Sequence, residues 1–153
     1  LSPLRGDFFR NTSTRFFNEA RACQTGDGMS RKNAKTLLIV EDDDDFQLLY
    51  RLYLQGESYR ILEARNGREG LEAIEQEKPD LIVLDMIMPE MDGEEFIRKL
   101  RFEKGILDIP IIIASVNDKI SPQLIEKGKV HSVLKKPFPM ETLLQKVEAA
   151  LGA

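Results

Sequence analysis

The sequence predicts an α/β fold in which five parallel strands form one sheet and helices cover both of its faces. Five short apolar runs alternate along the chain with segments whose apolar residues recur at helical spacing. The runs are continuous, which is typical of strands buried on both sides of a parallel sheet. The fivefold alternation of strand and helix therefore favours an open, doubly wound sheet.

The first strand is expected over residues 37–40, where Leu-Leu-Ile-Val is followed at once by acidic residues. A helix should follow, because apolar residues recur there at helical spacing. These residues are Phe46, Leu49, Leu52 and Tyr53. Asp44 or Asp45 is placed to cap this helix, since a carboxylate accepts hydrogen bonds from the free N–H groups of the first turn.

The second strand is expected over residues 59–64, and Asn66-Gly67 should then turn the chain. A second helix is marked by apolar residues at helical spacing, and Pro79-Asp80 should end it. Those apolar residues are Leu71, Ala73 and Ile74. The third strand, residues 81–84, is the most apolar run and leads directly into Asp85.

Three apolar residues, Phe96, Ile97 and Leu100, predict a third helix. The fourth strand should span 110–114 and end at Ser115, and a short helix should span 122–127. A weaker fifth strand is expected over 130–134, ending at Lys135-Lys136-Pro137. Pro139 should begin the last helix, since proline suits a first helical turn. One face of that helix carries Leu143, Leu144, Val147 and Leu151.

Composition excludes several classes of protein. Residues 34–153 carry 16 basic and 23 acidic side chains, so this part lacks the clustered positive charge that nucleic acid requires. No apolar run approaches the ~18 residues of a membrane helix, and no secretory signal is recognisable. One cysteine, Cys23, and one histidine, His131, are too few for a zinc site. A single cysteine suits a reducing compartment, so we expect a cytoplasmic protein.

Residues 1–33 differ from the rest, and we expect an N-terminal extension, linker or expression-derived tail there. The segment carries six basic and three acidic side chains and shows no helical or strand period. Its two Phe-Phe pairs, residues 8–9 and 16–17, could dock on the domain or on a partner, but a solvated tail is the preferred interpretation. We expect one domain over residues 34–153.

Polar residues follow four of the five predicted strands. They are Glu41 and Asp42 after the first, Asp85 after the third, Ser115 after the fourth and Lys136 after the fifth. In a parallel sheet these strand ends meet at one edge, where ligands bind. Crowded carboxylates repel each other, and Mg²⁺, which prefers oxygen ligands, would relieve the repulsion. With a lysine and a hydroxyl nearby, the site suits a phosphoryl group, and the central Asp85 is the expected nucleophile.

These residues give the chain a strong resemblance to the receiver domains of two-component response regulators. The matching pieces are LLIVEDD, PDLIVLDMIMPEMDG, PIIIAS and LKKPF, in the family's order and near its spacing. The resemblance runs from about Lys35 to Ala153. It implies a flavodoxin-like sheet of strand order 2-1-3-4-5 with five helices. It also implies phosphotransfer from a phosphohistidine of a sensor histidine kinase or histidine phosphotransfer protein.

The resemblance also assigns roles to the residues at the strand ends. By it, Asp85 is the phosphoacceptor and Asp42 binds Mg²⁺ directly, while Glu41 acts on the metal through water. The backbone carbonyl of Ile87 is a further expected metal ligand. Two other residues, Ser115 and Lys136, are expected to contact the phosphoryl oxygens.

Three more residues match the family pattern around the site. Pro137 follows the lysine, as the family expects, often after a cis peptide bond. In the loop after Asp85, Pro89 and Gly93 shape the chain. Gly93 is expected to adopt a backbone angle that other residues resist.

The sequence departs from the family at two places near the fifth strand. Val133 stands where the family has Tyr or Phe three residues before the lysine, which puts the usual aromatic relay in doubt. Lys129-Val130 replaces the usual Gly-Ala, so the local loop should differ. His131 is expected to be an exposed loop residue, and Asp44, Asp45, Glu90, Asp92 and Lys135 are expected to be capping or surface residues.

Three functions are compatible with these patterns. The leading one is a phosphorylation-controlled signalling domain, not an enzyme acting on outside substrates, with no output domain in this chain. Its partner-binding surface would be the face of the fourth helix, fifth strand and fifth helix. The second is a constitutive docking module using the same face, which Val133 favours. The third, a Mg²⁺-dependent hydrolase, ranks last because no second acid–base group or substrate-binding insertion is recognisable.

Overall fold

The described part of the chain contains one five-stranded sheet in the order β2-β1-β3-β4-β5. The structure is a computed structural model that describes residues 33–117 and 119–152, so the Phe-Phe pairs and Cys23 lie outside the described residues. Every neighbouring pair of strands in this sheet is parallel. The predicted fold class and strand order are therefore confirmed.

The elements fall close to their predicted places. The strands are β1 Thr36–Val40, β2 Arg60–Ala64, β3 Leu81–Leu84, β4 Ile111–Ser115 and β5 Val130–Lys135. The helices are α2 Asp44–Gly56, α3 Gly67–Gln76, α4 Gly93–Arg98, α5 Pro122–Lys127 and α6 Met140–Leu151. A π-helical segment, η2 Lys99–Glu103, continues α4, so the predicted third helix is in fact a composite.

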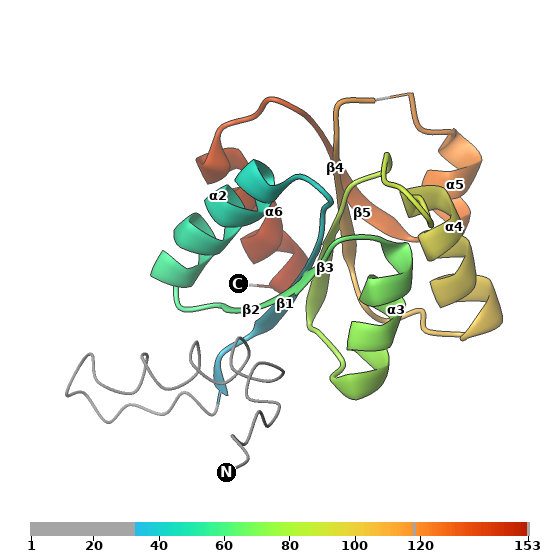
Figure 1. Cartoon of the computed structure of the whole chain (residues 1–153), viewed down its shortest axis with the longest axis horizontal. Coiled ribbons are helices and arrows are strands. Elements are labelled where there is room, and N and C mark those ends of the chain that lie inside the picture. The colour runs from blue at the N-terminus through green and yellow to red at the C-terminus, as the bar shows by residue number, and fades with distance from the viewer. Residues whose placement is uncertain (1–32, 118, 153) are drawn as a thin grey trace, which may run out of the picture. The chain divides into compact units, whose positions relative to one another are not determined.

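Helices α2 and α6 cover one face of the sheet, and α3, α4 and α5 cover the other (Figure 1). A hydrophobic core lies on each face of the sheet. Alternate residues of β1 pack into one core or the other, since successive side chains of a strand point to opposite faces. Leu38 and Val40 pack with the α3 and α4 side, whereas Leu37 and Ile39 pack with the α2 and α6 side. All four side chains are fully buried, as the continuous apolar run predicted.

The buried face of α2 differs from the predicted one. Gln47, Tyr50 and Leu54 are its buried residues, while Leu49 and Leu52 are 45% and 64% exposed. Gln47 is buried because its amide donates to the carbonyls of Glu41 and Ala64, both at 2.9 Å. A polar residue thus anchors the face toward the sheet. Of the predicted apolar set, Phe46 and Tyr53 do pack against the core, so apolar spacing was wrong only for Leu49 and Leu52.

Two helix starts also correct the sequence-based interpretation. Asp43, rather than Asp44 or Asp45, caps α2, since its Oδ1 accepts from the backbone N–H groups of Asp45 and Phe46. Asn66 caps α3 by accepting from the Glu69 N–H at 2.9 Å, so the predicted Asn-Gly turn is a helix N-terminus.

The region around β5 shows the predicted departures. Lys129 has a left-handed backbone, with φ of 49°, at the position where the family carries glycine. Val133 is half-buried and packs against the core on the α3 and α4 side. His131 is exposed, as expected, but it lies within β5 rather than in a loop. The peptide bond between Lys136 and Pro137 is cis.

A buried arginine joins the η2 segment to the end of α5. The Arg101 guanidinium donates to the carbonyls of Gly128, Ile106 and Ile109 at 2.8, 2.8 and 2.6 Å. Arg101 is only 2% exposed, and burial lowers its pKa from the usual value. Helix α5 itself has no fully buried residue, although Leu124 packs against the core, so the contact at Gly128 adds to the attachment of α5 to the domain.

Candidate phosphoacceptor and metal site

The ends of β1 and β3 bring acidic residues to one edge of the sheet. Val40 pairs with Leu84 in register, and the next residue of each strand is acidic, namely Glu41 and Asp85. The Asp85 N–H donates to the Val40 carbonyl at 3.0 Å, so the pairing continues up to the site. The backbone of the sheet therefore fixes the spacing of these two carboxylates.

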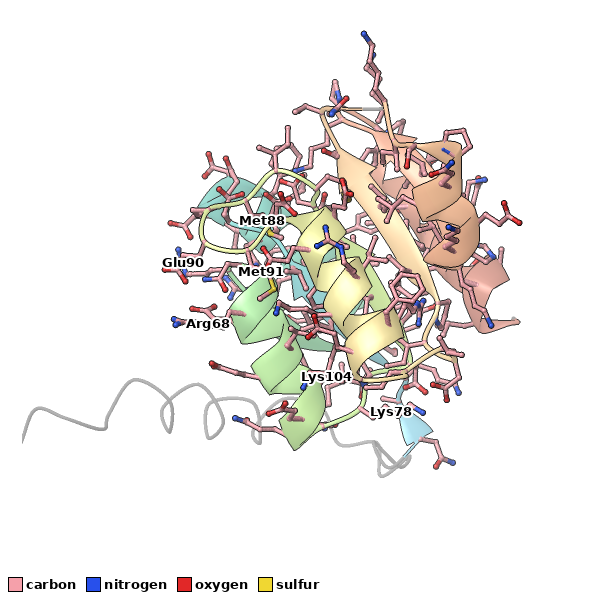
Figure 2. The ribbon with its side chains drawn as sticks, turned by 90° about the vertical axis from the view of Figure 1, so that its right-hand side faces the viewer. Arg68, Lys78, Met88, Glu90, Met91 and Lys104 are labelled. Atoms are coloured by element: carbon pink, nitrogen blue, oxygen red, sulfur yellow. The ribbon has the colours of Figure 1, made fainter. Side chains whose placement is uncertain are left out.

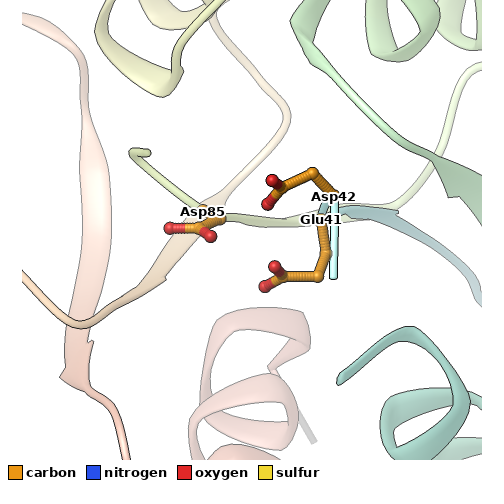
Figure 3. A group of neighbouring side chains, drawn as sticks. All are labelled: Glu41, Asp42 and Asp85. Atoms are coloured by element: carbon orange, nitrogen blue, oxygen red, sulfur yellow. The ribbon is translucent and has the colours of Figure 1, made fainter. Parts of the chain in front are cut away.

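Three carboxylates converge at this edge, from Glu41, Asp42 and Asp85. One oxygen of each lies within 4.8 Å of the others, and the side chains of Glu41 and Asp42 are directed toward Asp85 (Figure 3). Glu41 and Asp85 are 2% and 7% exposed, whereas Asp42 is exposed. Such a set of close, hard oxygen donors, open on one side, fits Mg²⁺ together with waters and a phosphoryl oxygen.

Lys136 lies between two of these carboxylates. Its Nζ is 2.5 Å from Glu41 Oε2 and 3.4 Å from Asp85 Oδ2, and the residue is 7% exposed. Its position follows from the strands, because the Lys136 N–H donates to the Ser115 carbonyl at 2.9 Å where β4 and β5 end. The sheet thus places an ammonium beside the predicted nucleophile.

The crowding of charge shifts the acid strength of Glu41. Burial, chiefly, and the charge of Asp85 raise the pKa of Glu41 from 4.5 to about 7, although Lys136 acts in the opposite direction. The folded protein therefore binds protons more tightly here than the unfolded chain does. The metal-free protein therefore loses stability as the pH rises from about 4.5 to about 7, and a bound cation would relieve that cost.

The two remaining predicted site residues are Ser115, at the end of β4, and Ile87, in the loop after β3. Ser115 is fully buried at the end of β4, and its Oγ accepts from the Asn117 N–H at 3.4 Å. Ile87 follows Asp85 by two residues and is 54% exposed, and its N–H donates to Asp85 Oδ1 at 3.2 Å. Ser115 is linked to Lys136 through the main chain, whereas the acidic residues of the β1 end meet Asp85 directly.

The loop after β3 is held against α3. The Gly67 N–H donates to the Met91 carbonyl at 3.1 Å, and Figure 2 shows Met91 and Glu90 beside the start of α3. Glu90 pairs with Arg68 at 3.5 Å, and Asp92 caps α4 by accepting from the Glu95 N–H. These surface acids, expected to do no chemistry, shape the segment that follows the predicted nucleophile.

Glycine is needed at position 93 for a different reason from the one expected. Its φ is not positive, so the expected unusual backbone angle is wrong. A Cβ at this position would instead lie 2.6 Å from the Asp85 carbonyl oxygen and 2.7 Å from the Met86 Cα. Glycine is required because the start of α4 passes directly over the backbone of Asp85.

One further residue at the site was not recognised in the sequence. Phe46, interpreted there only as part of an apolar helix face, places its ring 4.0 Å from the Lys136 ammonium. Its position in the first turn after the acidic run was the available signal, since that turn begins beside the strand end that carries Glu41.

The comparisons with known proteins agree with this geometry. The family model described as response regulator receiver domain matches residues 37–148 of the chain. The chain belongs to this family. It is a receiver domain of a response regulator, a signalling domain of two-component systems.

Curated relatives of this receiver domain are themselves response regulators. The response regulator MprA of Mycolicibacterium vanbaalenii is 35% identical over 117 residues, which cover 75% of this chain and 49% of MprA. The alkaline phosphatase synthesis transcriptional regulatory protein PhoP of Bacillus subtilis is 34% identical over 119 residues, 76% of this chain and 48% of PhoP. The chain thus spans about half the length of the curated relatives it matches.

Solved structures show the same receiver fold. The chemotaxis protein CheY4 of Vibrio cholerae matches with a TM-score of 0.68 and 30% identity, covering 77% of this chain and 99% of CheY4. The response regulator TrrA of Thermotoga maritima, solved in complex with Mg²⁺-BeF, gives a TM-score of 0.69 at 30% identity, covering 76% of this chain and 99% of TrrA. Receiver domains bind Mg²⁺ at an acidic pocket, and this chain has such a cluster.

Among the residues described, no helix is long and apolar enough to cross a membrane.

Proposed function

We propose that this receiver accepts a phosphoryl group on Asp85 from a phosphohistidine of a sensor kinase or phosphotransfer protein. The observation that carries the proposal is the position of Asp85, buried between two other carboxylates and the Lys136 ammonium. An Asp85 oxygen forms the new P–O bond while the P–N bond breaks, and the imidazole leaves with the electron pair. We further propose that residues 34–153 form the working domain in the cytoplasm, with residues 1–33 outside it.

The other residues have complementary roles in this proposal. Asp42 and Asp85, the Ile87 carbonyl and, through water, Glu41 would hold Mg²⁺. When bound, the ion supplies positive charge that offsets the carboxylates and the phosphoryl oxygens. Lys136 is already beside Asp85 and would pair with one phosphoryl oxygen, and Ser115 would donate to another. These roles need no further acid or base, because Asp85 attacks as a carboxylate.

Phosphorylation would then alter a partner-binding surface. We propose the face of α5, β5 and α6, because β5 and α5 adjoin the strand ends that carry Lys136 and Ser115. Val133, an aliphatic residue packed into the core, favours one alternative, in which the same face docks a partner constitutively. The phosphorylation-controlled surface and the constitutive docking surface differ in one measurable respect. Affinity for the partner changes on phosphorylation in the first and stays the same in the second.

Intact-mass measurement of the protein after reaction with a small phosphoryl donor tests the proposal. The protein is incubated with acetyl phosphate, with Mg²⁺ or with excess EDTA, and its intact mass is recorded. We expect one added phosphoryl group that requires Mg²⁺. An unchanged mass under all conditions, together with no Mg²⁺ binding, would refute the phosphoacceptor function and leave the constitutive docking module.

Mg²⁺ affinity should depend on pH through Glu41. Because its pKa is about 7 in the metal-free protein, Glu41 is mostly protonated at pH 6 and ionised at pH 8. Removing its proton favours the cation, so we expect Mg²⁺ to bind roughly tenfold more weakly at pH 6 than at pH 8, measured by titration calorimetry. Glu41→Gln should flatten this dependence. Equal Mg²⁺ affinity of the wild type at pH 6 and pH 8 would contradict the raised pKa of Glu41.

Phosphate loss should be slow. The Ile87 side chain is apolar and 54% exposed beside Asp85, so it cannot orient an attacking water by hydrogen bonding. We expect Ile87→Asn to speed decay of the phosphorylated form severalfold, followed by intact mass after acetyl phosphate is removed. Leu107→Asn, which changes an exposed apolar residue outside the site, is the matched control. Rapid decay of the wild type in Mg²⁺ buffer would refute the expectation.

A further inference from the structure

The Lys136 ammonium contacts an aromatic ring as well as two carboxylates. Its Nζ lies 4.0 Å from the ring centroid of Phe46, 2.5 Å from Glu41 Oε2 and 3.4 Å from Asp85 Oδ2. The ring comes from α2, while the carboxylates come from the ends of β1 and β3. Three separate elements therefore confine one cation.

The Phe46 ring is itself held in place. Its backbone N–H donates to the capping carboxylate of Asp43 at 3.1 Å, which fixes the first turn of α2. Its ring contacts that of Tyr50, with centroids 6.0 Å apart and planes at 35°. Tyr50 is fully buried one turn further along the helix, so the ring is supported from the domain core.

A ring face holds a cation without using its hydrogen atoms. The negative face of an aromatic ring attracts an ammonium, and more strongly where water is excluded. Lys136 is 7% exposed, and its ammonium has three N–H groups. Glu41 and Asp85 occupy two of them, so one remains for a phosphoryl oxygen. A carboxylate in place of the ring would compete for that donor and add charge to a crowded acidic site.

We propose that Phe46 is a positioning residue for Lys136, holding the ammonium where it meets the phosphoryl group on Asp85. This inference rests on the proposed function. If Phe46 only filled apolar space under α2, a leucine at this position would pack equally well. Only a positioning role requires an aromatic face.

The test compares Phe46→Leu, which keeps apolar bulk but removes the ring, with Phe46→Tyr, which keeps the ring. Leu52→Ala, on the exposed side of the same helix, controls for general changes in α2. The rate of phosphorylation by acetyl phosphate and the affinity for beryllium fluoride with Mg²⁺ are measured for each. We expect Phe46→Leu to lower both about threefold to tenfold, while Phe46→Tyr and Leu52→Ala stay near wild type. Mg²⁺ affinity alone should change less than about twofold in all variants, since the three carboxylates that would hold the ion, those of Glu41, Asp42 and Asp85, are unchanged.

A direct readout of the contact does not depend on phosphorylation. The Lys136 ε-methylene NMR signal, assigned with Lys136→Arg, should be shifted upfield by the ring in wild type and Phe46→Tyr, and not in Phe46→Leu. If wild type shows the shift but takes no phosphoryl group, the proposed function fails while the contact stands. The positioning role is overturned if Phe46→Leu reacts like wild type, or if Phe46→Tyr is impaired equally.

Discussion

Replacing Asp85 with asparagine is expected to abolish the incorporation of phosphoryl groups from acetyl phosphate. An amide has the shape of the carboxylate but lacks its nucleophilic anionic oxygen, so no acyl phosphate can form. Asp85 lies at the end of β3 beside Lys136 and the other two carboxylates, and no larger change is expected from any single substitution. Intact mass after incubation with acetyl phosphate and Mg²⁺ measures the loss.

The control for Asp85→Asn is Asp80→Asn. Asp80 precedes the same strand at its opposite end, where its Oδ2 accepts from the Thr36 N–H at 2.8 Å. This variant should take up phosphoryl groups as the wild type does, although it loses some stability. Full labelling of Asp85→Asn, with circular dichroism showing a folded protein, would mean that a different residue is the acceptor.

Gly93→Ala is expected to lower the free energy of unfolding by about 2–3 kcal/mol. The added Cβ would lie 2.6 Å from the Asp85 carbonyl oxygen and 2.7 Å from the Met86 Cα, and neither backbone atom can move alone. Either α4 or the end of β3 must shift, so phosphorylation should slow as well. Urea unfolding measures the first effect, and the acetyl phosphate reaction measures the second.

Gly56→Ala is the matched control for that substitution. Gly56 is the last residue of α2, a Cβ added there would meet no atom within 4 Å, and its φ is not positive. Alanine is the better helix former there, so this variant should be as stable as the wild type or up to about 1 kcal/mol more stable. If both glycine variants lose the same stability, the close approach at Gly93 is not the cause.

The sheet and much of the site could be predicted from the sequence for one physical reason. Strands buried on both faces are continuous apolar runs, so their ends can be located to within a residue or two. In a parallel sheet those ends share an edge, and Glu41, Asp42, Asp85, Ser115 and Lys136 were therefore expected to lie together. The structure brings together the three carboxylates and Lys136, whereas Ser115 meets Lys136 through a main-chain hydrogen bond.

What could not be predicted depends on contacts between distant segments. The buried side of α2 is set by Gln47, whose amide bonds to carbonyls of β2 and the β1 end, so apolar spacing misplaced Leu49 and Leu52. The need for glycine at Gly93 comes from a backbone lying across it. The ring of Phe46 gains its significance only from Lys136, 90 residues away in the chain.

The Arg101 contact ties the C-terminal end of α5 to the η2 segment. One guanidinium fixes the residue after α5, Gly128, to the η2 segment, and a Cβ on Gly128 would also meet Ile97 of α4 at 2.8 Å. The other end of α5 begins at Pro122, a few residues beyond Ser115, and no side chain of the helix is buried. Leu124 is half-buried and packs against the core, while four of the six residues of α5 are exposed, so the helix offers most of its surface to solvent and keeps its C-terminal end fixed by Arg101.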